Sequence, residues 1–105
     1  MAAYGPSLSG LSAAALQVAA AAGNVANLNS KDYRARRVDF SSSPDGGVHL
    51  GQVSESQETP VEGSSNVDLA TEMVQLLSGS FYFRANAAAF RAQDKLLGAT
   101  LDLKA

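Results

Sequence analysis

The sequence predicts a mainly α protein in which two long terminal helices pair as a coiled-coil-like hairpin or bundle, with a small β-hairpin and an extended linker between them. Apolar residues recur at alternating spacings of three and four near both ends of the chain, and this period places one apolar stripe along one side of each helix. Between the two ends, the helical period disappears and turn-forming residues gather. The 105 residues are enough for a single domain with a small core.

The first predicted helix covers residues 7–29. Ser7 is the expected N-cap. Asn27 and Asn29 mark the expected end, because asparagine tolerates the left-handed conformation that often closes a helix. Alanine favours helix but buries little area, so the helices can approach closely while the isolated chain gains little stability. The stripe of this helix consists of Leu8, Leu11, Ala15, Val18, Ala22 and Val25.

The middle of the chain, residues 31–63, is predicted to be a β-hairpin followed by a linker. Arg36, Val38 and Phe40 alternate with the residues between them in the manner of a half-buried strand. Residues 43–47 form a strong turn signal, and the alternation resumes over residues 48–53. Residues 54–65 are polar and indicate an extended linker. Since a lone hairpin is only marginally stable in water, we expect this one to pack on the helices or on a neighbour.

The second predicted helix covers residues 66–101, which corresponds to roughly 50 Å at 1.5 Å per residue. Ser65 and Asp68 stand three residues apart, as in a capping box. Most helices of globular proteins are far shorter, so this length indicates a coiled coil or a bundle. The stripe of this helix consists of Leu69, Met73, Leu76, Ser80, Phe83, Ala87, Phe90, Asp94, Leu97 and Leu101.

The apolar members of the two stripes are expected to form a helix-pairing or assembly interface. Phe81 and Tyr82 lie off the stripe, which leaves two interpretations open. They pack on the first helix or the hairpin, or they form a second binding face for a neighbouring subunit, since exposed aromatic residues are common at interfaces. The expected interface residues are Leu8, Leu11, Val18, Val25, Leu69, Met73, Leu76, Phe83, Phe90 and Leu97.

The composition offers little for catalysis or ligand binding. The chain has a net charge of -2 and no cysteine, so nucleic-acid binding, disulfides and thiolate metal sites are not expected. His49 is the only histidine and lacks the neighbours that a metal site or a catalytic triad needs. We therefore predict an exposed histidine, and no enzyme activity, metal, cofactor or small-molecule substrate. The apolar runs are expected to be too short to span a bilayer, and the absence of Lys or Arg before residues 13–22 argues against a cleaved signal.

Two segments resemble the signatures of flagellar rod and hook proteins. The N-terminal signature of that family typically reads N-I-A-N, two residues, T, one residue, then G-Y. Residues 23–34 are similar, with Val25, Ser30 and Asp32 in place of the isoleucine, threonine and glycine. Residues 65–73 resemble the C-terminal signature, and residues 83–86 stand where the family usually has Y-x-A-N. The matching residues are Asn24, Ala26, Asn27, Tyr33, Asn66, Val67, Leu69, Glu72, Met73 and Asn86.

The resemblance implies a structural subunit of the bacterial flagellar basal-body rod, and the short middle is most similar to a proximal-rod protein. Such proteins are exported unfolded through the flagellar type III apparatus, without signal cleavage, and their terminal helices pair into a helical axial tube in the periplasm. The implied partners are further copies of the chain, other rod and hook proteins, and the export apparatus. The alternative is a small helical adaptor or secretion chaperone that binds a client through its apolar stripe. The two motifs favour the rod subunit.

Overall fold

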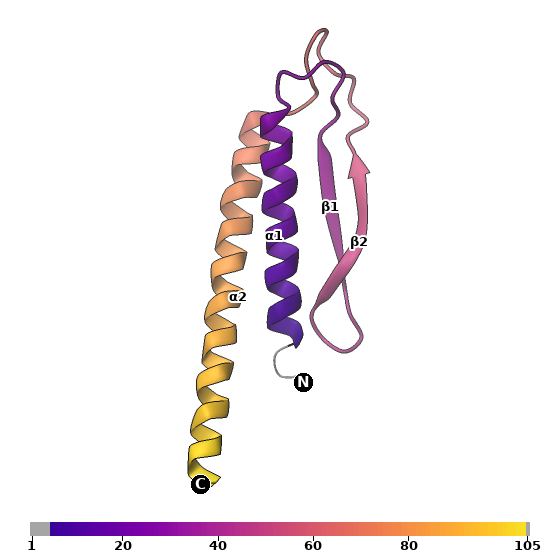
Figure 1. The fold of residues 1–105 in the computed structure, drawn as a ribbon. Helices are drawn as coiled ribbons and strands as arrows, with labels where there is room; N and C mark the ends of the chain where they lie inside the picture. The colour runs from indigo at the N-terminus through magenta and orange to yellow at the C-terminus, as the bar shows by residue number, and fades with distance from the viewer. Residues whose placement is uncertain (1–4, 105) are drawn as a thin grey trace.

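The computed structural model describes residues 5–104 and contains two helices with a hairpin between them in sequence (Figure 1). Helix α1 (Gly5–Ala26) is followed by strands β1 (Arg36–Ser42) and β2 (Val48–Glu55), and helix α2 (Leu69–Lys104) ends the described chain. The predicted mainly α class with a small central hairpin is therefore confirmed.

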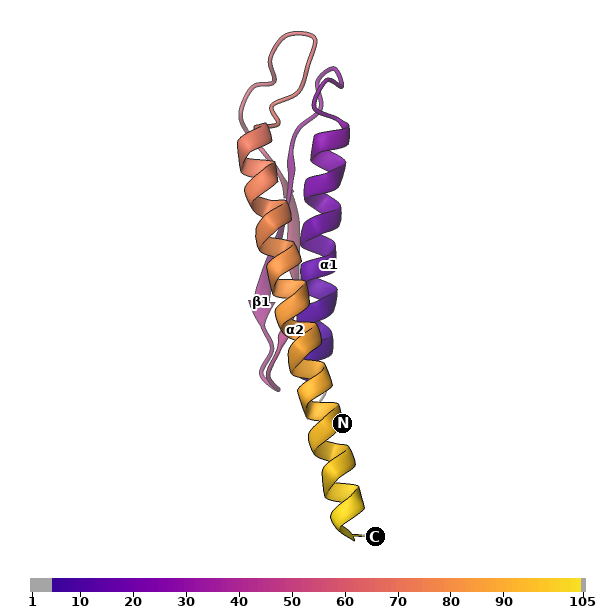
Figure 2. The ribbon, with the colours of Figure 1, turned by 90° about the vertical axis from the view of Figure 1, so that its left-hand side faces the viewer.

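Helix α1 lies between the two other parts of the molecule. Figure 1 shows α2 running antiparallel to α1 on one side and the β-hairpin on the other. The molecule is elongated, with extents of 67 × 24 × 14 Å. Near the start of α1, Ser7 Oγ donates a hydrogen bond to Gln93 Oε1 at 2.9 Å. Since α2 runs on to Lys104, about 16 Å of helix, at 1.5 Å per residue, projects beyond this contact (Figures 1 and 2).

The bounds of α1 differ from residues 7–29 for local reasons. The helix already includes Gly5, so Ser7 is no N-cap; its side chain is buried against α2. At the other end, the Asn27 amide side chain donates to the Gly23 carbonyl at 2.8 Å and so satisfies a carbonyl of the last turn. Neither Asn27 nor Asn29 is left-handed, because Asp32 is the one non-glycine residue with positive φ among residues 5–104.

The start of α2 is set by Asp68, which caps the helix. Asp68 Oδ1 accepts from the backbone N–H of Ala70 at 3.1 Å, and the Thr71 hydroxyl donates to Asp68 Oδ2 at 3.0 Å. The helix therefore begins at Leu69, not at residue 66, and it runs past residue 101. The expected capping box with Ser65 does not form, because Ser65 Oγ accepts from the Val67 N–H and its hydroxyl donates to the carbonyl of Leu28.

The hairpin has the predicted antiparallel strands and turn. A bulge interrupts the register: Asp39 pairs with Gln52 and Phe40 pairs with Leu50, which leaves Gly51 without a partner. The hairpin packs on α1. Its second strand begins where the Val48 N–H donates to Ser9 Oγ at 3.1 Å, so the hairpin gains the support that two isolated strands lack.

Helix α1 meets the length and composition criteria for a membrane span. It has 22 residues, and the mean hydropathy reaches 1.3 over an 18-residue window. The expectation that no apolar run approaches this length is therefore wrong, since the alanines raise the hydropathy of the whole helix. A core helix of a folded protein and a signal sequence near the N-terminus meet the same criteria; 17% of this window is buried, and α1 packs against both α2 and the hairpin. That the chain does not span a membrane stays a prediction.

Candidate assembly site

Asn24 and Glu72 join the two helices through a buried hydrogen bond. Both side chains have 0% exposure, and Asn24 Nδ2 donates to Glu72 Oε1 at 2.8 Å. The second Asn24 N–H donates to the carbonyl of Arg36 at 2.9 Å. Asn24 Oδ1 accepts from the Arg36 N–H and from the Tyr33 hydroxyl, each at 2.9 Å. The Asn24 amide thus uses its full hydrogen-bonding capacity. It joins α1 to α2, to β1 and to the segment between α1 and β1.

Arg37 supplies the positive charge that Glu72 needs. Its Nη2 lies 2.8 Å from Glu72 Oε2 and its Nη1 lies 3.1 Å from Glu72 Oε1, which is the bidentate geometry of a strong ion pair. The Arg37 side chain is 35% exposed. Its hydrogen bonds to Glu72 raise the pKa of the guanidinium above its ordinary value although burial opposes this, so Arg37 keeps its charge. We call Asn24, Tyr33, Arg37 and Glu72 the polar junction.

The polar junction determines how the helices are rotated about their axes. Every buried side-chain nitrogen and oxygen in the described part of the chain has a hydrogen-bond partner. Turning α2 away from Arg37 would leave the Glu72 carboxylate buried and unpaired, which is strongly unfavourable. The arrangement is therefore specified by polar groups, because the alternatives are penalised.

Asn66 makes a second set of hydrogen bonds beside the polar junction. Its Oδ1 accepts from the Ala35 N–H at 2.7 Å, and its Nδ2 donates to the Glu58 carbonyl at 2.7 Å. The Asn66 N–H donates to the Tyr33 carbonyl at 3.1 Å, and Arg34 Nη1 donates to the Glu58 carbonyl at 3.0 Å. The linker before α2 is consequently tied to the segment that leads into β1.

Asp32 has a left-handed backbone, with φ of 61°, at the position where the resembling family usually has glycine. Its N–H donates to the Ser64 carbonyl at 2.8 Å, so the conformation serves the contact with the linker. We expect Asp32→Val to lower the free energy of unfolding by about 1–2 kcal/mol, because a β-branched residue is strained at positive φ. Asp32→Gly should stay within about 0.5 kcal/mol of the parent, since relief of strain offsets the greater freedom of the unfolded chain. Urea unfolding measures both, and equal stability of the two variants would contradict the assignment.

The buried line between the helices consists mainly of small and polar residues. Along α1 it comprises Ser7, Ala14, Ala21 and Asn24, and along α2 it includes Glu72 and Gly79. The expected stripes lie beside this line. Leu8 (49%), Leu69 (47%), Met73 (50%), Phe83 (43%) and Leu97 (37%) are exposed, whereas the remaining expected interface residues are half-buried, namely Leu11, Val18, Val25, Leu76 and Phe90.

Within one chain, these five residues are therefore not buried between α1 and α2, and their place in the expected interface stays a prediction. The polar junction requires Glu72 to face inward, which rotates α2 and turns part of its stripe to one side. Whether the two stripes take part in contacts between chains is not settled by their exposure within one chain, and this role stays a prediction.

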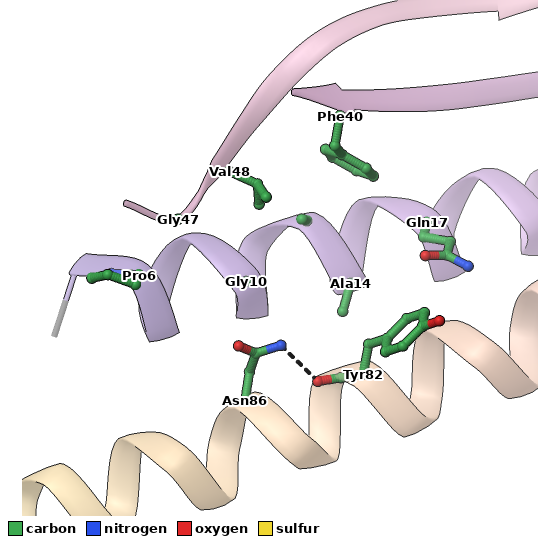
Figure 3. A pocket seen from close by; sticks show the side chains of 10 residues that line it. Pro6, Gly10, Ala14, Gln17, Phe40, Gly47, Val48, Tyr82 and Asn86 are labelled. Atoms are coloured by element: carbon green, nitrogen blue, oxygen red, sulfur yellow. Dashed lines mark hydrogen bonds between the residues drawn. The ribbon is translucent and has the colours of Figure 1, made fainter. Parts of the chain in front are cut away.

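Two glycines let the helices approach closely. A Cβ added at Gly79 would lie 2.7 Å from Val18 Cγ2, and a Cβ added at Gly10 would collide with the side chain of Asn86. Figure 3 shows Asn86 below Gly10, where Asn86 Nδ2 donates to the Tyr82 carbonyl at 2.9 Å. The motif residue Asn86 thus packs where α1 has no side chain.

We expect Gly79→Ala to lower the free energy of unfolding by about 1–2 kcal/mol, because forced overpacking outweighs the better helix propensity of alanine. The matched control is Gly98→Ala in the projecting part of α2, where an added Cβ meets nothing within 4 Å. This control should be neutral or stabilise by up to about 1 kcal/mol. Thermal unfolding followed by circular dichroism should separate the two. A stabilised Gly79→Ala variant would show that the helices are not closely packed there.

The other motif residues and the aromatic cluster have different surroundings. Ala26 ends α1 and is exposed, and Val67 is half-buried. Phe81 (63%) and Tyr82 (52%) are exposed, but only Tyr82 lines a groove of about 410 Å³ beside the hairpin, together with Phe40 and Val48. Figure 3 shows Phe40 and Val48 pointing towards α1 from the hairpin. Tyr82 therefore fits the first interpretation, because it lies beside the hairpin. Phe81 fits the second, because it is left available to a neighbour.

Within residues 5–104, no group of three or more His, Cys, Asp and Glu side chains could hold a metal ion. His49 is exposed on β2, with Nδ1 3.1 Å from Ser43 Oγ. The described polar groups hold the helices and the hairpin together, while many large apolar side chains are exposed to solvent. This arrangement defines a helical module with exposed apolar side chains.

Comparison with known families gives this class a name. Residues 62–103 match the family model described as flagellar basal body rod FlgEFG protein C-terminal. This match confirms the resemblance to the flagellar basal-body rod family over this part of the chain, and it supports a structural role in the flagellar basal body. The match covers Asn66, Glu72 and Asn86, while Asn24 lies outside it but binds Glu72 directly. No curated protein matches the chain.

Proposed function

We propose that the chain is a rod subunit that assembles with copies of itself, and with other axial proteins, through its two long helices. The observation that carries this is the exposed area. The chain exposes 7024 Å², whereas a compact monomer of its mass, 10.8 kDa, would expose about 5,500 Å². The excess of roughly 1,500 Å² is about twice the 800 Å² that one partner buries in a standard protein interface.

The projecting end of α2 exposes large apolar side chains. Leu96 (70%), Leu101 (59%) and Leu103 (88%) are exposed on the projecting end of α2, beyond the point where Ser7 meets Gln93. Soluble monomers rarely leave apolar surface of this extent uncovered. Neighbouring subunits that cover this end would remove it from water and gain the corresponding hydrophobic free energy.

The small core supports export in an unfolded state. The buried hydrophobic residues of the described chain are Ala14, Ala21 and Ala35, which contribute little hydrophobic free energy each. A chain with so small a core unfolds easily. This suits passage through the flagellar type III apparatus without a cleaved signal, followed by folding on a growing rod in the periplasm. The short segment between the helices supports a proximal-rod member.

The test is where the chain is found and whether it associates. We expect sedimentation velocity to show association that increases with concentration, and basal bodies isolated from the source organism to contain the chain. A stable cytoplasmic dimer that is absent from basal bodies would favour the adaptor or secretion chaperone instead. A folded monomer at high concentration would contradict self-assembly.

A further inference from the structure

A groove runs between the two helices, and no hairpin residue lines it. It has a volume of about 500 Å³ and is lined by Ala15, Val18, Ala19, Ser80, Phe83 and Arg84. We call this the helix groove. On α1, Ala13 faces the hairpin side, where it lines the groove with Phe40 and Val48. Ala15 lies two residues further, about 200° around the helix, so the hairpin leaves the helix groove open.

The back of α2 carries an apolar ridge without charged residues. Val74 (59%), Leu77 (71%) and Phe81 (63%) are exposed, and the spacing continues with alanines that are also exposed. Successive steps of three, four and four residues keep such a ridge on one side of a straight helix. We define the α2 ridge as Val74, Leu77, Phe81, Ala85, Ala88 and Ala92.

We propose that the α2 ridge of one copy inserts into the helix groove of a second copy. The two surfaces lie on neighbouring faces of α2, since Phe83 of the groove lies about 120° and Ser80 about 60° around the helix from Leu77 of the ridge. The floor of the groove is small, at Ala15, Ala19 and Ser80, whereas the ridge begins with large side chains. The ridge therefore supplies the volume that the groove lacks.

The exposed area favours a second copy as the occupant. The excess over a compact monomer is roughly 1,500 Å², and a standard interface buries about 800 Å² per partner. One contact through a single face would cover about half of the excess. A copy that uses its ridge on one neighbour and its groove on another makes two contacts, which together bury an area of that size. The helix groove also continues the α1–α2 packing sideways, with the half-buried Val18 in its wall.

Because the two surfaces differ, the contact is heterologous. Such contacts repeat and form open helical assemblies unless the rotation closes a ring. Two grooves cannot fill each other, and two ridges in contact would leave both grooves empty. The inference rests on the proposed self-assembly and adds to it the two faces that meet.

The test uses two variants that each remove one face. Ala15→Glu places a charge in the groove, and Leu77→Glu places a charge on the ridge. Both positions are exposed within one chain, so both variants should keep the parent circular dichroism spectrum. Each alone should associate at least about a hundredfold more weakly, because burying an unpaired charge is strongly unfavourable. Gln52→Glu, on the exposed strand β2, should associate like the parent.

Mixing the two variants is the decisive step. The intact ridge of the Ala15→Glu variant should enter the intact groove of the Leu77→Glu variant and form a one-to-one complex that grows no further. Native mass spectrometry would detect it. If the single variants still associate like the parent, or if the mixture stays monomeric, the ridge–groove contact is wrong while self-assembly stands. If the parent itself never associates, self-assembly and the contact both fail.

Discussion

Arg37→Met is expected to lower the free energy of unfolding by about 3 kcal/mol, because it leaves the fully buried Glu72 carboxylate without its positive partner. Removing one member of a buried ion pair typically costs about 3–5 kcal/mol. The lower end applies here because the Arg37 side chain is 35% exposed, so water can partly replace it. Asn24 would remain as a neutral hydrogen-bond donor to Glu72. Urea unfolding at neutral pH measures the loss.

The neighbouring arginine provides a matched control. Arg36 lies 3.8 Å from Glu55, and both side chains are more than half exposed, so Arg36→Met should cost less than about 1 kcal/mol. The backbone of Arg36, which binds Asn24, is unchanged by this substitution. The double variant Arg37→Met/Glu72→Gln should recover much of the loss, because no buried charge remains and glutamine can still accept from Asn24. Similar costs for Arg36→Met and Arg37→Met would refute the assigned role of the polar junction.

Val18→Asp is expected to abolish assembly. The half-buried Val18 side chain faces Gly79 across the helix pair; α1 itself has no charged residue, and Arg84 of α2 is the cation that lines the same groove. Burying the carboxylate there costs several kcal/mol. A core of small side chains gives a low free energy of unfolding, so this cost is large in comparison. In the source organism, we expect the subunit to be made but no rod to be completed, and the cells to be non-motile in a soft-agar assay.

His49→Ala is the control for this prediction. The imidazole is exposed on β2, so its loss should leave assembly and swimming unchanged. If the histidine variant loses motility while Val18→Asp swims, the helix pair is not the assembly element, and a functional site in the hairpin must be sought.

Local sequence signals predict the two helices, the hairpin and the resemblance to the family. The apolar period of the two ends predicts helices whatever they pack against, and the proline–glycine turn at residues 43–47 predicts the hairpin. The family motifs include Asn24, Tyr33, Asn66 and Glu72, which make side-chain hydrogen bonds between distant parts of the chain. Arg37 was missed, since its only sequence signal was a place in a short basic run on a predicted strand.

The sequence by itself therefore determined which segments are helices and strands, whereas the tertiary structure decided which helix faces meet. An apolar period specifies a stripe, but α1 is so rich in alanine that several of its faces are similarly apolar, and hydrophobic burial alone does not choose between them. The choice comes from Glu72, which can be buried only where Asn24 from α1 and Arg37 from β1 reach it together. Those partners are distant in sequence and converge only in the folded chain, because a buried charge tolerates one arrangement of its neighbours and penalises the others.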